Sequence, residues 1–169
     1  MEQTRLNTTS NSVDKIIGGI GFTAILLLIG LPIFYYSSLP DIIPTHYGFN
    51  GEADGFGSKN NIWMPSILGL TTYLSILLII KYIPVIGKTS LTTNSSEEKI
   101  PMTKKQIEIT QKTLGILNTL MACTSVYIQY ITMQTAFGYT GGLGSYFIIV
   151  LLLLTFGTLG YSVVKLSKE

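Results

Sequence analysis

Four long runs of mainly apolar residues constrain the fold of this chain more than any other feature. They cover about residues 16–36, 62–80, 113–137 and 143–164, and no Asp, Glu, Lys, Arg or His lies inside them. A run of about 18 or more apolar residues matches the hydrocarbon thickness of a lipid bilayer and exceeds most elements of a soluble core. The sequence therefore predicts an all-α, polytopic membrane protein with four transmembrane helices in the lipid bilayer.

The composition and the remaining segments agree with this class. Charged residues make up 12% of the 169 residues, which is about half of the fraction in a typical soluble domain. Residues 1–14 are polar and are expected to form a disordered N-terminal tail, and residues 15–169 one four-helix membrane domain. Thr103 and Gln106 fit a capping box, which predicts that the third helix begins near Lys104.

The basic residues predict how the helices cross the membrane. Ten of the eleven Lys and Arg residues lie before the first run, between the second and third runs, or after the fourth. Basic residues accumulate in cytoplasmic segments, so both termini are expected in the cytoplasm and the segment around Lys59 outside the cell. The net charge of +2 is too small to indicate nucleic-acid binding.

The segment between the first two runs has the composition of a structured loop. It reads LPDIIPTHYGFNGEADGFGSKN over residues 39–60. Pro40 and Pro44 restrict the backbone around them to extended conformations. Turn dipeptides follow, at Asn50-Gly51 and Asp54-Gly55. A connection of this length is usually functional or carries structure of its own, so we expect a structured extracytoplasmic loop.

The polar residues of this loop suggest either a metal site or an enzyme. Asn50, Glu52 and Asp54 alternate as in the first half of a calcium loop, although the twelfth position is Asn61 rather than a bidentate Glu. His46 with nearby carboxylates would instead resemble a zinc site.

His46 with Asp41 or Asp54 could also act as a general acid and base. A membrane-embedded, metal-dependent enzyme that uses Asp41, His46 and Asp54 is therefore an alternative function.

A structural interpretation competes with both, and we favour it. In this interpretation Asn50 and Asp54 cap turns, His46 bonds to a backbone carbonyl, and Lys59 pairs with an acidic residue. The aromatic residues expected to pack over the helix ends are Phe49, Phe56 and Trp63.

The third run carries a stripe of small and polar residues spaced by three or four positions. The stripe consists of Gln111, Gly115, Asn118, Ala122, Ser125, Gln129 and Thr132. Small residues let helices approach closely in lipid, and amides or hydroxyls bond across them. We therefore expect the stripe to pack against other helices, with Gly18, Gly21 and Ala24 as partners. A polar path for a solute, as in a small transporter, is the alternative.

Several positions of the loop also form a pattern. They are Leu39, Pro40, Ile43, Pro44, His46, Gly51, Asp54, Gly55, Gly57, Ser58 and Lys59. With Tyr47 in place of Phe and Phe56 in place of Trp, the pattern resembles the signature of the domain-of-unknown-function 1648 family of bacterial membrane proteins. The resemblance extends over about residues 20–70.

This resemblance implies a protein of the bacterial inner (plasma) membrane. The family is related to SdpI-like immunity proteins, which protect the cell from a secreted toxin. We accordingly expect a non-enzymatic protein of the immunity or sensor type, which binds an extracytoplasmic peptide or toxin through residues 39–59. A second copy of the chain or another membrane protein is a further candidate partner, and no cofactor is expected.

Overall fold

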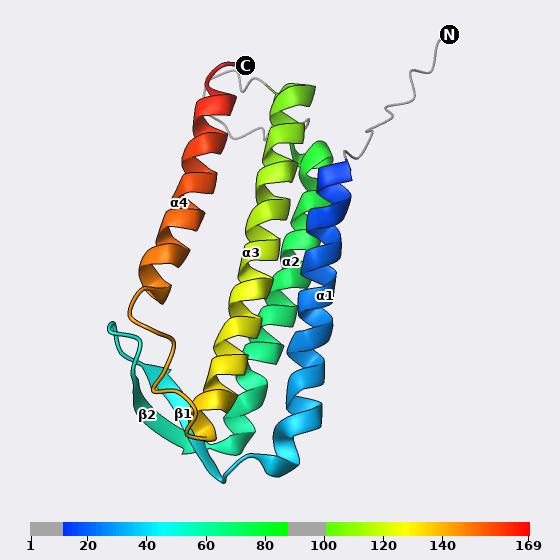
Figure 1. The fold of residues 1–169 in the computed structure, drawn as a ribbon. Coiled ribbons are helices and arrows are strands. Elements are labelled where there is room, and N and C mark those ends of the chain that lie inside the picture. Colours follow the sequence, from blue (N-terminus) through cyan, green and yellow to red (C-terminus); the bar gives the residue numbers. More distant parts are fainter. Residues whose placement is uncertain (1–11, 88–100) are drawn as a thin grey trace, which may run out of the picture.

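Four long helices and a short hairpin make up the described part of the chain (Figure 1). The computed structural model describes residues 12–87 and 101–169. Its helices are α1 (Ser12–Tyr35), α2 (Met64–Ile86), α3 (Lys104–Ala136) and α4 (Phe147–Leu166). Between α1 and α2 lie the 3₁₀ turns η1 (Tyr36–Ser38) and η2 (Lys59–Trp63) and the strands β1 (Ile42–Tyr47) and β2 (Ala53–Ser58).

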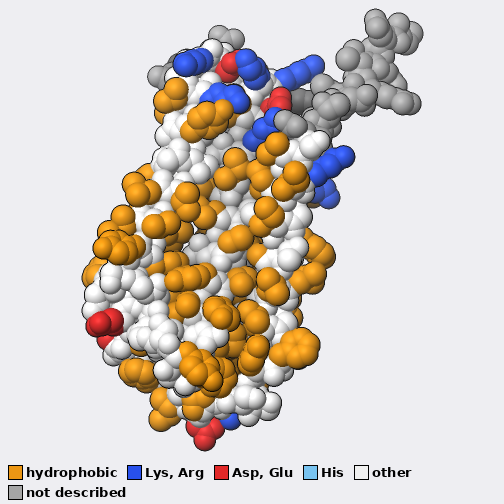
Figure 2. All heavy atoms as spheres, viewed as in Figure 1, with side chains coloured by type: hydrophobic (Ala, Val, Ile, Leu, Met, Phe, Trp, Pro, Cys, Tyr) orange, Lys and Arg blue, Asp and Glu red, His pale blue; other side chains and the backbone are white. Residues whose placement is uncertain are grey.

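All four helices are long and apolar enough to span a membrane, as the sequence predicts. Their outer surfaces expose large hydrophobic side chains such as Phe34, Leu68 and Leu153, and side chains of this kind cover much of the bundle in Figure 2. Lipid hydrocarbon matches such a surface better than water does. These features indicate a multi-pass membrane protein.

The helix ends differ from the predicted runs where local backbone signals lie outside the apolar stretches. α1 begins at Ser12, so residues 12–14 of the predicted tail are helical, and residues 1–11 lie outside the described part. α4 begins at Phe147 rather than near residue 143. Gly144 just before it has a φ of +87°, which a helix cannot contain.

The capping box predicted before α3 is confirmed. Thr103 Oγ1 accepts a hydrogen bond from the backbone N–H of Gln106 at 3.1 Å, and Gln106 Oε1 accepts one from the backbone N–H of Thr103 at 2.9 Å. These bonds satisfy two amide groups that a helix leaves free at its start. As a result α3 begins well before its apolar run and reaches 33 residues.

α1, α2 and α3 pack around a common core, and α4 packs mainly against α3. The core consists of Ala24, Ile25, Leu28, Tyr73 and Ala122. Gly69 of α2 permits the close packing, since a Cβ there would lie 2.6 Å from Leu28 Cδ2. On the α4 side of α3, the rings of Tyr127 and Phe147 stack with centroids 5.0 Å apart.

The all-α prediction is incomplete, because the loop between α1 and α2 contains a sheet. β1 and β2 pair antiparallel, from Ile42 opposite Ser58 to Tyr47 opposite Ala53, with an irregular register around His46. The prolines favour the extended backbone of the first strand, and Gly51, with a φ of +80°, lies in the reversal. The extracytoplasmic location of this hairpin stays a prediction.

The connection between α3 and α4 lies against the hairpin turn (Figure 1). The backbone N–H of Leu143 donates to Gly51 O at 2.7 Å, and that of Ala53 donates to Gly141 O at 3.1 Å. A Cβ on Gly51 would lie 2.5 Å from Gly144 O, so the approach requires glycine. Two connections that are distant in sequence therefore form one unit at one end of the bundle.

Candidate functional site

One face of the hairpin, residues 39–59, packs against the end of the bundle. Leu39, Ile43 and Ile62 form a buried cluster with Met133 of α3. The hydroxyl groups of Tyr47 and Thr132 lie 2.9 Å apart in a hydrogen bond. Burial raises the pKa of the Tyr47 phenol, which keeps this hydroxyl protonated. One face of the hairpin therefore packs against the bundle, and the polar residues of the hairpin lie on the opposite, exposed face.

His46 pairs with Asp54 near the turn of the hairpin. The distance from His46 Nδ1 to Asp54 Oδ1 is 2.5 Å, and both side chains are exposed. His46 lies opposite Gly55 across the strands, and a Cβ on Gly55 would lie 2.8 Å from that of His46. The bond of His46 is thus to a carboxylate and not to the backbone carbonyl expected from the sequence, because strand pairing places the two residues side by side.

Asp41 pairs with Lys59 at the other end of the hairpin. Lys59 Nζ lies 2.9 Å from Asp41 Oδ1, and the backbone N–H of Lys59 donates to Asp41 O at 2.9 Å. The ammonium group also lies 5.6 Å from the ring centroid of Tyr36. The ammonium group of Lys59 therefore links Asp41, directly before β1, to Tyr36 at the start of η1.

Asn50 shapes the turn itself. Its Oδ1 accepts a hydrogen bond from the backbone N–H of Glu52 at 3.1 Å, and its Nδ2 donates to Glu52 Oε2 at 2.7 Å. Two backbone bonds, from Gly48 to Glu52 and from Gly51 to Gly48, close the turn, each at 2.9 Å. These bonds hold the turn closed at the surface.

The remaining loop residues named by the sequence have shaping positions. Pro40 is exposed and Pro44 is buried. Ser58 Oγ accepts a hydrogen bond from the backbone N–H of Asn60 at 3.4 Å and so caps η2. A Cβ on Gly57 would lie 2.9 Å from Asn61 Nδ2, so the glycine makes room for the start of η2.

The candidate metal ligands are divided among separate pairs. His46 meets Asp54, Asp41 meets Lys59, and Glu52 meets Asn50. Within residues 12–87 and 101–169, no three His, Cys, Asp or Glu side chains form a group that could hold a metal ion. The calcium-loop spacing is instead used by the turn and by strand β2. Of the three enzyme candidates, the structure brings together His46 and Asp54 but not Asp41.

Two of the three loop aromatics lie away from the helix ends. Phe49 is 96% exposed and Phe56 is 62% exposed, which contradicts the expectation that they pack over the bundle. Trp63 alone packs there, with its ring 6.3 Å from that of Tyr36. The exposed pair lies on the turn and on β2, whose free side points away from the bundle core.

The α3 stripe faces the neighbouring helices through its amides. Gln111 Nε2 donates to Ile80 O at 2.9 Å, Asn118 Nδ2 to Tyr73 O at 3.3 Å, and Gln129 Nε2 to Ile62 O at 3.0 Å. The donors are spaced 7 and 11 residues apart along α3, and the acceptors are spaced equally in the reverse direction. The three bonds therefore hold α3 antiparallel to the chain of η2 and α2 in one register.

The other stripe residues differ in their surroundings. Ala122 and Thr132 are buried. Ser125 Oγ donates to Met121 O within α3, and no atom outside the helix lies within 4 Å of a Cβ built on Gly115. On α1, Gly21 lies close to Thr119 and Tyr73, whereas Gly18 has no such neighbour.

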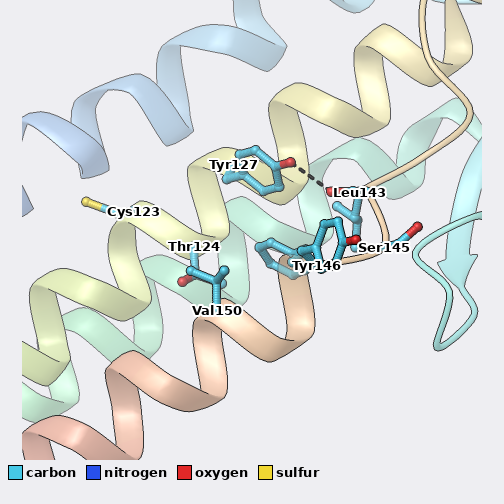
Figure 3. Close-up of a pocket in the computed structure, with 9 residues that line it drawn as sticks. Cys123, Thr124, Tyr127, Leu143, Ser145, Tyr146 and Val150 are labelled. Atoms are coloured by element: carbon cyan, nitrogen blue, oxygen red, sulfur yellow. Dashed lines mark hydrogen bonds between the residues drawn. The ribbon is translucent and has the colours of Figure 1, made fainter.

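A shallow pocket lies between α3 and the start of α4 (Figure 3). It measures about 500 Å³ and is lined by Cys123, Tyr127 and Val150 among others, with no charged side chain. Tyr127 donates to Leu143 O at 2.8 Å across its rim. The lining is mainly apolar and suits an apolar chain.

Sequence reasoning missed the contribution of residues 141–144 to the hairpin. The available signal was the glycine-rich stretch Thr140 to Gly144, since clustered glycines mark close backbone approach. It also missed Ser66, which accepts from Gln129 Nε2 at 2.7 Å and donates to Leu28 O at 2.7 Å.

A family model matches one segment of the chain. Residues 23–70 match the family model described as Domain of unknown function (DUF1648). This stretch runs from within α1 through the hairpin into α2. The signature of the loop and the family model thus agree on the same part of the molecule.

A relative is known from an archaeon. An uncharacterized protein of Archaeoglobus fulgidus is 37% identical over 71 residues, which cover 37% of this chain and 39% of the relative. The chain therefore matches well under half of that protein's length. No solved structure matches the chain.

Proposed function

We propose that the chain is a non-enzymatic protein of the plasma membrane that recognises a cationic peptide outside the cell, in the manner of an immunity or sensor protein. Its recognition element is the hairpin of residues 39–59. We include in this proposal the relation to SdpI-like immunity proteins that the loop signature suggests.

The distribution of lysines supports an outward-facing hairpin. All lysines of the described residues except Lys59 belong to the start of α1, the end of α2, the start of α3, the end of α4 or the residues directly after it. These ends gather opposite the hairpin, where Figure 2 shows the blue side chains. Because basic residues favour the cytoplasmic side, the hairpin belongs outside.

The observation that carries the proposal is the acidic and aromatic surface of the hairpin. Asp41, Glu52 and Asp54 are exposed there. The basic side chains beside them are Lys59, which pairs with Asp41, and His46, which pairs with Asp54. Phe56 lies exposed on β2. Complementary charge steers a partner and selects it, and an exposed aromatic ring supplies contact area. A partner with basic and apolar side chains fits both features.

The alternatives have less support from the geometry. The enzyme alternative uses Asp41, His46 and Asp54. His46 pairs with Asp54, whereas Asp41 pairs with Lys59 at the far end of the hairpin, so the three side chains do not form one site. The transporter alternative needs free amides along α3, yet Gln111, Asn118 and Gln129 donate to backbone carbonyls of η2 and α2.

The test is binding of a defined probe to the protein in lipid nanodiscs. The probe is a fluorescently labelled peptide of lysine and leucine, and its charge-reversed partner carries glutamate in place of lysine. The nanodiscs contain phosphatidylcholine only, so that lipid charge does not attract the probe. We expect the lysine peptide to bind protein-loaded discs above empty discs, and the glutamate peptide not to do so.

A matched pair of variants locates the binding. Asp41→Asn with Glu52→Gln and Asp54→Asn removes three carboxylates at the hairpin, and Asp14→Asn with Glu108→Gln and Glu169→Gln removes three at the opposite end. At about 0.5 kcal/mol for each exposed charge, the hairpin variant should bind roughly tenfold more weakly, and the control should bind as the parent does. Equal binding by both variants, or none above empty discs, would contradict the proposal.

A further inference from the structure

We propose that the turn of the hairpin, with Phe49 at its corner, inserts into the headgroup region of the membrane leaflet beside the start of α4. This interaction with lipid concerns the turn alone and holds whatever the acidic face of the hairpin recognises.

Phe49 is exposed although its backbone is fixed. Its side chain is 96% exposed, while the turn around it is closed by the bonds from Gly48 to Glu52 and from Gly51 to Gly48. A loosely held side chain could fold back onto the protein, but a closed turn presents this ring outward. A large apolar side chain held away from the protein gains free energy when lipid covers it instead of water.

The turn is placed beside the point where α4 begins. Glu52 forms a bridge with Gly142, and the backbone N–H of Leu143 donates to Gly51 O at 2.7 Å. Figure 1 shows the turn next to the start of α4. The stacking of Tyr127 on Phe147 and the bond from Tyr127 to Leu143 O (Figure 3) fix that start against α3.

The length of α4 indicates where the membrane surface lies. α4 has 20 residues, so at about 1.5 Å per residue it spans about 30 Å, the thickness of the bilayer hydrocarbon. Its start at Phe147 therefore lies near one boundary of the hydrocarbon. Because the turn is bonded to residues just before this start, Phe49 lies at the same boundary.

Neighbouring tyrosines support the interfacial location. Tyr146, directly before α4, is 75% exposed, and Tyr139, in the same connection, is 78% exposed. Tyrosine is enriched at the interface between hydrocarbon and headgroups because it has an apolar ring and a polar end. The turn adds Phe49 to this group, while Asn50 and Glu52 beside it remain suited to the hydrated headgroups.

The experiment places a tryptophan at the turn and measures its depth. The chain has one tryptophan, so the background is Trp63→Phe. In this background, Phe49→Trp is the reporter, and Thr45→Trp, at an exposed position of β1, is the control. Both are reconstituted in phosphatidylcholine vesicles that carry bromine at a shallow or a deep acyl position, with iodide as the quencher from water.

We expect shallow bromine to quench the Phe49→Trp reporter at least twofold more than the control and more than deep bromine does, as for an interfacial side chain. Iodide should quench the control more strongly than the reporter. Strong quenching of the reporter by iodide without quenching by bromine would place the turn in water and overturn the proposal. Protection from both quenchers would show that protein covers the turn, which overturns it equally.

Discussion

At the scale of single residues, Gln129 connects α3 to neighbouring elements of the bundle. Its side chain is 0% exposed, and its Nε2 donates to Ile62 O and to Ser66 Oγ. The Ser66 hydroxyl in turn donates a hydrogen bond to Leu28 O of α1. One amide of α3 is therefore joined to η2, α2 and α1. In hydrocarbon there is no water to replace these partners.

The substitution Gln129→Leu tests this role. It keeps the side chain about the same size and removes both donated bonds, so we expect it to destabilise the folded protein by about 1 kcal/mol. The measurement is the unfolding curve of the protein in micelles of a mild detergent as a denaturing detergent is added.

Ser125→Ala is the control, since the Ser125 hydroxyl donates to Met121 O in its own helix and, among the described residues, to no neighbouring helix. It should leave the curve nearly unchanged. If both substitutions shift the curve equally, the hydrogen bonds from Gln129 to Ile62 and Ser66 do not contribute to the stability of the folded protein.

The hairpin residues show which single-residue properties a sequence predicts. Asn50 before Gly51 predicts a turn because of backbone geometry local to the dipeptide. The partner of His46 has no such local cause. It depends on the register that places His46 opposite Gly55, which depends in turn on an irregularity in the strand.

At the scale of elements, glycine position decides how closely the helices pack. A Cβ on Gly69 would lie 2.6 Å from Leu28 Cδ2 and 3.1 Å from Ser125 Cβ. The same residue type at Gly115 has no such neighbour within 4 Å. Both glycines lie within apolar helices, and only their surroundings distinguish them.

We therefore expect Gly69→Ala to cost about 1–3 kcal/mol of folding stability through overpacking. Gly115→Ala should be neutral or stabilising by up to about 1 kcal/mol, because alanine favours the helix. Thermal unfolding of the two variants in the same detergent measures the difference. A Gly69→Ala variant as stable as Gly115→Ala would argue against the close contact of α1, α2 and α3.

The helices themselves could be predicted from their sequence because bilayer thickness sets a minimum length for an apolar run. The first residues of α3 and α4 depend on other signals, namely the capping box at Thr103 and the positive φ of Gly144. The strands were not predicted as strands, because four glycines and two prolines within residues 39–58 conceal the usual alternation of apolar and polar residues.

At the scale of the whole molecule, the hairpin joins two connections that are distant in sequence. Gly51 and Gly138 both have a φ of +80°, so alanine is strained at either position. Only Gly51 also lies against another segment, with Gly144 O 2.5 Å from the site of a Cβ. The two glycines thus separate the cost of backbone conformation from the cost of losing the contact.

The N–H groups of Leu143 and Ala53 donate across this contact, and they lose their protection from exchange when the contact opens to solvent. We therefore expect Gly51→Ala to speed amide hydrogen exchange at Leu143 and Ala53 at least tenfold. Gly138→Ala should change exchange at these two amides much less. Hydrogen exchange followed by mass spectrometry of the protein in nanodiscs provides the measurement. Equal effects would mean that the two connections do not stabilise one another.

The sequence by itself determined the four apolar helices, the start of α3 and the turn at Asn50-Gly51, because bilayer thickness, capping and glycine geometry act over a few residues. The tertiary structure alone decided that His46 meets Asp54, that Gly51 meets residues 142–144, and that Gln129 joins the helices through Ser66. These contacts depend on which backbone and side-chain groups remain free after the helices pack. No local pattern in the sequence predicts which of these groups come into contact.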